Sequence, residues 1–162
     1  MNRFPRHLPI WITLIWIGLG SAIALDFDRL KQSLLARFGP TQVVLLGDWQ
    51  QMLSKGRGAG SELDKLRQVN DFFNQRIFFD DDISIWGQSD YWATPLETIA
   101  RGRADCEDFS IAKYYSLLDA GIPLKKLRLV YVKASQGVPG GTVQQAHMVL
   151  AYYANPNADP LG

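Results

Sequence analysis

The chain has 162 residues, 47% of them hydrophobic, and its 17 basic and 16 acidic side chains give a net charge of +1. This size and composition suit a single globular domain and exclude a disordered or fibrous chain, while the charge balance gives no support for nucleic-acid binding. A single cysteine, Cys106, excludes an internal disulfide. The thiol is therefore either buried and inert or reactive and used.

The first 24 residues are typical of a secretory signal peptide. Arg3 and Arg6 precede an uncharged apolar stretch over 8–25, and Ala22-Ile23-Ala24 supplies a small-x-small ending. A retained membrane anchor is the alternative, because the uncharged stretch approaches the length of a spanning helix. We predict export, with a signal peptide at 1–24 and one domain at 25–162.

Helical periodicity dominates the first part of this domain. Residues 26–38 place their apolar side chains on one stripe, with Asp26 as N-cap. A short second helix is predicted over about 41–55, followed by a flexible glycine-rich connection at 56–60.

Two capping boxes mark further helices. Ser61-x-x-Asp64 predicts a helix that continues to about residue 77, and Thr94-Pro95-x-Glu97 predicts another that ends at Gly102. The acidic and aromatic segment 78–92 is predicted to be a loop. A last helix is expected from Asp105 to about Asp119.

The final third changes to the period of a β-strand. The segments "KLRLVYVK" and "QAHMVLAYY" predict two strands, joined by the loop "ASQGVPGGT". N-terminal helices followed by an antiparallel sheet indicate the α+β class.

Cys106 and His147 are the candidate catalytic residues. Cys106 falls in the first turn of the last helix, where free N–H groups and the helix dipole stabilise a thiolate. His147 lies within an apolar strand and needs a polar partner there, which the cysteine could provide as in cysteine hydrolases. A small core cysteine and a locally satisfied histidine are the alternative, and two such residues are too few for structural zinc.

Three carboxylates surround this cysteine: Asp105, Glu107 and Asp108. The helix dipole alone would favour acids at this position. They would nevertheless raise the pKa of a working thiol, and a bound hard cation would remove that conflict. Carboxylates suit Ca²⁺, so these three residues are the candidate metal ligands.

The stretch "YWATPLETIARGRADCEDFSIAKYYSLLDAGIP", followed by a strand and "AHMVLAYY", resembles the bacterial transglutaminase-like cysteine proteinases. Within them it is most similar to the periplasmic LapG-type proteases. The resemblance implies a papain-like or transglutaminase-like core with Cys106 as nucleophile and His147 as general base and acid. It places calcium at Asp105 and Glu107, and less directly at Asp108.

The resemblance also implies a biological role. Such proteases are periplasmic, depend on calcium and release a large surface adhesin by cleaving it, which affects biofilms. An inner-membrane receptor for cyclic di-GMP sequesters them. We therefore expect a calcium cofactor, an adhesin substrate and such a receptor as partner.

One departure from the family pattern concerns the third member of the catalytic triad. The resemblance implies an aspartate about 17 residues after His147, beyond Gly162. Asp159 is not assigned this role, since "NPNADPLG" is typical of the preceding turn. A C-terminally truncated domain is thus expected, and a catalytically impaired binding module or an acyl transferase remain alternatives.

Overall fold

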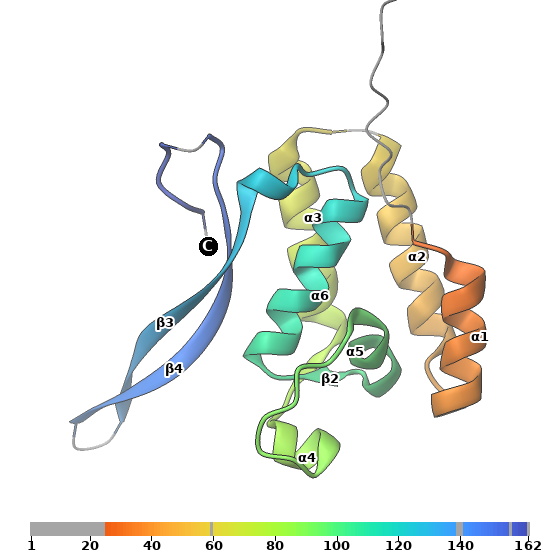
Figure 1. The fold of residues 1–162 in the computed structure, drawn as a ribbon, viewed down its shortest axis with the longest axis horizontal. Helices are drawn as coiled ribbons and strands as arrows, with labels where there is room; N and C mark the ends of the chain where they lie inside the picture. Colours follow the sequence, from red (N-terminus) through yellow and green to blue (C-terminus); the bar gives the residue numbers. More distant parts are fainter. Residues whose placement is uncertain (1–24, 59, 139–140, 156, 162) are drawn as a thin grey trace, which may run out of the picture.

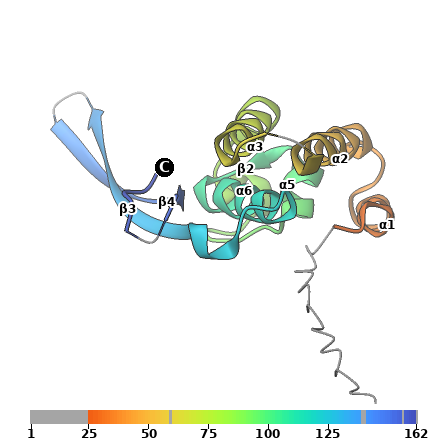
Figure 2. The ribbon, with the colours of Figure 1, turned by 90° about the horizontal axis from the view of Figure 1, so that it is seen from above.

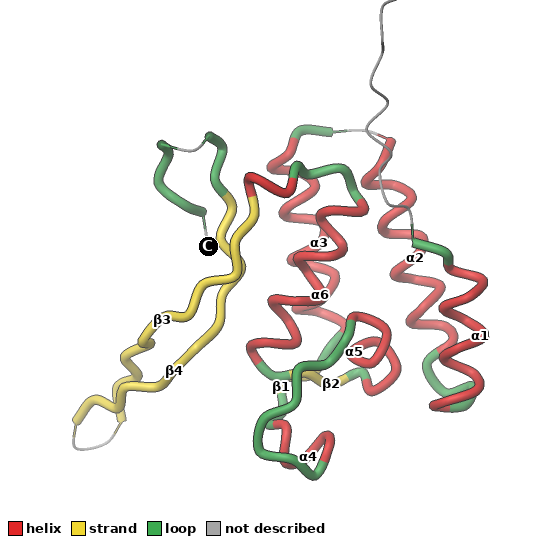
Figure 3. Tube along the Cα trace, viewed as in Figure 1, coloured by secondary structure: helices red, strands yellow, loops and turns green. Residues whose placement is uncertain are grey.

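A helical body and a long β-hairpin make up the described part of the protein (Figure 1). The structure is a computed structural model that describes residues 25–58, 60–138, 141–155 and 157–161. The hairpin leaves the helical body at one end, and helix α1 lies at the far side of that body (Figure 2). Helices first and an antiparallel sheet last confirm the predicted α+β class (Figure 3).

Local sequence signals determine where the first and third helices begin. Helix α1 (Phe27–Phe38) begins at Asp26, whose side chain accepts a hydrogen bond from the Arg29 N–H. Helix α3 (Glu62–Arg76) begins with the predicted capping box between Ser61 and Asp64. In both helices the capping side chain accepts a hydrogen bond from a backbone N–H of the first turn, which has no acceptor within the helix.

Helix α2 (Val43–Gly58) is longer than predicted, because it includes most of the segment expected to be flexible. Leu45, Leu46, Trp49, Met52 and Leu53 are buried along it. Gly56 is also buried, and a Cβ there would contact Gln68 and Ala120 at 3.6 and 3.7 Å. Tertiary packing therefore overrides the low helix propensity of glycine.

The segment predicted to be a loop contains regular structure. Strand β1 (Phe78–Phe79) pairs in parallel with β2 (Arg103–Ala104), and α4 (Asp82–Trp86) follows β1. Helix α5 (Pro95–Arg101) has the predicted capping box and ends at Gly102, with φ +64°. The strand β2 then leads directly into α6 (Cys106–Asp119).

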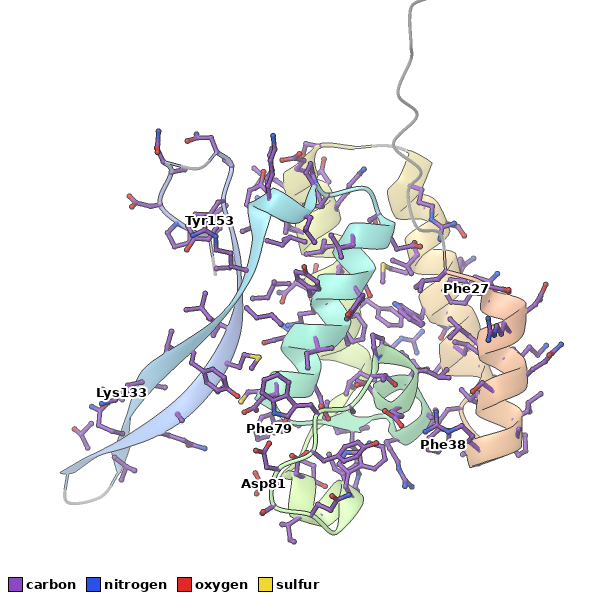
Figure 4. All side chains as sticks on the ribbon, viewed as in Figure 1. Phe27, Phe38, Phe79, Asp81, Lys133 and Tyr153 are labelled. Carbon is purple, nitrogen blue, oxygen red and sulfur yellow. The ribbon has the colours of Figure 1, made fainter. Side chains whose placement is uncertain are left out.

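A 3₁₀ turn, η1 (Leu124–Lys126), connects α6 to the hairpin of β3 (Leu127–Val138) and β4 (Gly141–Tyr152). The register runs from Leu127 opposite Tyr152 to Val138 opposite Gly141, so both strands extend through most of the predicted connecting loop. The outer part of the hairpin is exposed and extends away from the helices, as Lys133 shows in Figure 4.

The core lies between the helices and the base of the hairpin. Its fully buried members include Leu34, Leu53, Phe73 and Ile99. Trp49 contributes the largest buried side chain, and its indole N–H donates to Ser116 Oγ at 2.9 Å. This bond joins α2 to α6 and fixes the helix that carries the candidate nucleophile.

The predicted signal peptide at 1–24 lies outside the described residues. Within the part that is described, none of the helices has both the length and the apolar character needed to cross a membrane.

Candidate active site

Cys106 is the first residue of α6, as the sequence predicts. Asp105 is the N-cap, and its Oδ1 accepts a hydrogen bond from the Asp108 N–H at 3.1 Å. The preceding strand β2 is fixed by pairing with β1. The thiol is thus positioned at a helix N-terminus by elements on both sides of it in sequence.

The thiol has two polar neighbours. Cys106 Sγ donates to Glu107 Oε2 at 2.6 Å and accepts from the Met148 N–H at 3.4 Å. Ser110 Oγ donates to the Met148 carbonyl at 3.2 Å. Both backbone groups of Met148 are therefore held by α6, which docks the outer edge of β4 beside the nucleophile.

Burial and the contact with Glu107 raise the pKa of the Cys106 thiol to about 11. The Met148 N–H acts in the opposite direction but is outweighed. The helix N-terminus was expected to lower the pKa of the thiol. The pKa is raised instead, since burial and the negative charge of neighbouring carboxylates oppose a thiolate. The structure thus reproduces the conflict between thiol and acids that the sequence suggests.

His147 lies in β4 opposite Val132, next to the Met148 that contacts the thiol. The half-buried imidazole and Cys106 both line one cavity of about 700 Å³ between α3, α6 and β4. Among the described residues, no hydrogen bond joins the imidazole to the thiol, which bonds to Glu107 instead. The catalytic roles of Cys106 and His147 stay predictions, but the fold brings the two residues into the same cavity.

The carboxylates near the thiol form two overlapping groups. One oxygen each of Asp105 and Glu107 lies with Cys106 Sγ within mutual distances of 4.8 Å, and the same holds for Asp82, Asp105 and Asp108. Asp82 was missed in the sequence, where it lies in a segment predicted to be a loop. The run Asp80-Asp81-Asp82 was the available signal, but nothing in it distinguishes the buried member.

Two buried carboxylate oxygens in this cluster, Asp82 Oδ1 and Asp108 Oδ2, have no hydrogen-bond partner, although the Trp86 indole N–H lies near enough to lower the pKa of Asp108. Their other oxygens accept from the Tyr91 N–H at 2.5 Å and from the Ala93 N–H at 2.6 Å. Such unpaired buried acceptors are costly unless a cation binds them. As hard oxygen ligands, they fit a divalent cation such as Ca²⁺.

The pKa values in the cluster agree with this interpretation. Burial, assisted by Glu107, raises the pKa of Asp105 to about 7, and burial raises that of Asp108 to about 6. Burial also opposes ionisation of Glu107, but hydrogen bonds, the first of them from Cys106, lower its pKa. Adjacent carboxylates that resist full ionisation are typical of a site built around a positive charge.

Asp159 does not take part in this site. It is exposed and does not line the cavity with Cys106 and His147. The chain beyond it returns to the hairpin, where Tyr152 and Leu161 exchange both backbone hydrogen bonds, at 2.7 and 2.8 Å. Leu161 thus pairs with the outer edge of β4, antiparallel to it.

Comparison with known proteins identifies a family and several similar solved structures. A family model described as bacterial transglutaminase-like cysteine proteinase matches residues 50–153. No curated protein matches the chain.

The similar solved structures include LapG from Legionella pneumophila in several forms. One is 28% identical with a TM-score of 0.66 and covers 85% of this chain and 71% of that one. The calcium-bound form is 31% identical with a TM-score of 0.64 and covers 84% and 70%. The EGTA-treated form is 29% identical with a TM-score of 0.65 and covers 85% and 69%. Because the family model spans more than half of the sequence and the folds agree, the chain belongs to the bacterial transglutaminase-like cysteine proteinases.

Proposed function

We propose that the protein is a calcium-dependent cysteine endopeptidase with Cys106 as nucleophile and His147 as general base and acid. The observation that carries this proposal is the placement of a thiol at a helix N-terminus and an imidazole in the same cavity. In a member of a cysteine proteinase family, this pair has the residue types that nucleophilic catalysis on a peptide bond requires.

The reaction follows from the chemistry of the two groups. His147 takes the proton of the Cys106 thiol, and the sulfur attacks the carbonyl carbon of the scissile peptide bond. The tetrahedral intermediate collapses as His147 gives that proton to the departing amine, leaving an acyl-enzyme. Water, deprotonated by His147, then releases the acid and restores the thiol. The backbone N–H of Cys106, in the first turn of α6, is available to the oxyanion.

The two overlapping groups that would hold calcium share Asp105, with Glu107 on the side of the thiol and with Asp82 and Asp108 on the other side. When bound, calcium would supply the positive charge that neutralises the carboxylates beside the thiol. Support comes from the two buried oxygens without partners and from LapG of Legionella pneumophila, which has been solved in a calcium-bound form. Asp105 and Glu107 contribute from both sides of the nucleophile, so the same residues connect metal and thiol.

In the cell, we propose that the enzyme is exported to the periplasm, where it cleaves and so releases a large surface adhesin. A receptor for cyclic di-GMP controls the enzyme. This role rests on the features of 1–24 that are typical of a signal peptide and on the likeness to LapG. Proteolysis of the adhesin would detach it and so weaken a biofilm.

The test is cleavage of the N-terminal segment of a large adhesin from the same cell by purified protein. We expect cleavage with calcium, none after EGTA treatment, and none by Cys106→Ala under either condition. His147→Ala should also abolish cleavage, whereas Tyr115→Ala, an exposed position further along α6, should not. Cleavage that persists in Cys106→Ala contradicts the assignment of the nucleophile.

Two additional measurements separate the alternatives. A primary amine added to the reaction would yield a conjugated product if the acyl-enzyme transfers to amines rather than to water. Full cleavage in excess EGTA would remove calcium from the proposal and leave the thiol mechanism intact.

A further inference from the structure

Two half-exposed aromatic rings lie beside the candidate nucleophile. Trp92, in the segment between α4 and α5, is 50% exposed, and Tyr131, on β3, is 57% exposed. Their ring centroids are 6.4 Å apart with planes inclined by 45°, within the range of favourable aromatic pairs. The pair therefore joins the helical body to the hairpin at a place where neither ring is covered.

Tyr131 neighbours two residues that contact the thiol, Glu107 and Met148. Its hydroxyl donates to Glu107 Oε1 at 3.3 Å, and Glu107 Oε2 accepts from the Cys106 thiol. In the register of the hairpin Tyr131 lies opposite Met148, whose N–H donates to Cys106 Sγ. Tyr131 therefore lies next to Glu107 of α6 and opposite Met148 of β4, and both of these residues contact the thiol.

Trp92 is fixed to the same cluster from the other side. The N–H of the next residue, Ala93, donates to the buried carboxylate of Asp108 at 2.6 Å. The indole N–H itself donates to Asp90 Oδ1 at 3.1 Å, which orients the ring. Neither Trp92 nor Tyr131 lines the cavity that contains His147, so the pair adds a second surface at the thiol.

Exposure alone does not single these rings out, since Phe78, Phe79 and Tyr115 are also at least 50% exposed, but their connection to the residues around the thiol does. The most deeply buried aromatic side chains of the core, Trp49 and Phe73, are at most 1% exposed, and an aromatic ring left in water loses a large apolar stabilisation. Exposed apolar surface held rigidly beside a reactive group is typical of a binding site. The position of Tyr131, which contacts Glu107 next to Cys106, indicates that the ligand is the polypeptide that the thiol attacks.

The geometry points to Trp92 and Tyr131 as a substrate-binding wall that contacts the extended peptide segment next to the scissile bond. This assignment rests on the proposed function, because it takes Cys106 as the reacting group. The two rings bind the peptide through apolar contact, and the hydroxyl of Tyr131 serves to position its ring through Glu107. Loss of either ring should weaken peptide binding, and because Tyr131 also bonds to Glu107 beside the thiol, this loss is measured relative to the reactivity of the thiol itself.

The experiment compares two alkylating reagents on the calcium-supplemented protein. A tri-alanyl chloromethyl ketone presents an extended backbone to the site, and iodoacetamide reports the thiol alone. In both reactions the sulfur displaces a halide and forms a C–S bond, so the ratio of the two rate constants cancels the thiolate fraction. We expect Trp92→Ala and Tyr131→Ala to lower this ratio about fivefold to tenfold, the worth of one aromatic contact.

Matched variants make the result specific. Tyr131→Phe keeps the ring and should retain most of the ratio, and Tyr115→Ala removes an α6 ring that is as exposed as Trp92, 50%, and should retain it fully. Iodoacetamide rates and circular dichroism check folding, and Trp92→Leu replaces Trp92→Ala if the latter does not fold. An unchanged ratio in both ring-deleting variants overturns the inference. A lowered ratio in a protein that cleaves no adhesin supports the wall and contradicts the proposed substrate.

Discussion

At the scale of single residues, Glu107 controls the state of the Cys106 thiol. It accepts the hydrogen bond of the thiol and is the first neighbour, after burial itself, to raise the pKa of Cys106 to about 11. In metal-free buffer at pH 8, the thiolate fraction should then be about one in a thousand. Negligible alkylation by iodoacetamide is expected at that pH.

Glu107→Gln should increase this reactivity, because the neutral amide no longer opposes a negative sulfur. The pH at half-maximal alkylation should move downward from about 11 toward the ordinary value of about 8.5. Alkylation rates between pH 6 and 11 measure the shift. Asp48→Asn, which removes a partly exposed carboxylate paired with Arg76 on the helical body, serves as control. An unchanged profile in Glu107→Gln would assign the raised pKa to burial alone.

Asp82 is the residue that best separates a cation site from a mere acidic surface. It is 5% exposed and one of its oxygens has no partner, whereas the adjacent Asp81 is exposed. Asp82→Asn should weaken calcium binding at least about tenfold and remove the rise in melting temperature that calcium gives the parent protein. Asp81→Asn should bind like the parent. Titration calorimetry and thermal unfolding with and without EGTA measure both, and equal losses in the two variants would exclude a specific role for Asp82.

The carboxylates next to Cys106 in the sequence could be predicted as site residues, whereas the distant Asp82 could not. Asp105, Glu107 and Asp108 flank the only cysteine, so their proximity to Cys106 follows from chain connectivity. Asp82 joins them only because β1 pairs with β2 and places α4 next to the start of α6. A non-local pairing of two short strands leaves no periodic pattern in either one.

At the scale of elements, α2 shows where local propensity fails. Gly56 lies inside a helix where a linker was predicted, and it is buried with negative φ and room for a methyl group. Gly56→Ala should therefore stabilise the protein by about 0.5–1 kcal/mol, since alanine loses less backbone entropy in a helix. Urea unfolding followed by circular dichroism measures the change.

Gly102→Ala is the matched control, and it should destabilise the protein. This glycine has φ +64°, and a Cβ would lie 3.1 Å from Gln42 Nε2, so substitution should cost about 1–2 kcal/mol. Stabilisation absent at Gly56 would mean that its segment is not helical in solution.

The elements that the sequence predicted well share one property. The starts of α1, α3 and α5 depend on a cap and on residues three positions later, so a local motif determines each of them. The strands of the hairpin were placed correctly but too short, because pairs such as Ser135 with Gln144 extend the ladder through polar residues. Polar residues on an exposed ribbon give no hydrophobic alternation to detect.

At the scale of the whole molecule, one buried carboxylate connects segments that are distant in sequence. Asp119, at the end of α6, has a side chain that is 1% exposed and pairs with Arg57 of α2. Its two oxygens accept from Arg57 at 2.6 and 2.9 Å, and Oδ1 also accepts from the Leu25 N–H at 3.0 Å, just before α1. The helix that begins at the nucleophile is thereby held at its other end.

Asp119→Ala should destabilise the protein by about 2–3 kcal/mol, because it leaves the partly exposed Arg57 guanidinium and the Leu25 N–H without their acceptor. Asp48→Ala removes an ion pair of equal length, 2.6 Å, in which the carboxylate is 32% exposed, and should cost less than about 1 kcal/mol. Urea midpoints of the two variants measure the difference, with Asp119→Asn as substitute if the alanine variant does not fold. Because the loss lies far from the thiol, iodoacetamide reactivity of folded Asp119→Asn should match the parent. Similar midpoints for Asp119→Ala and Asp48→Ala would show that α1, α2 and α6 are held together by apolar packing alone.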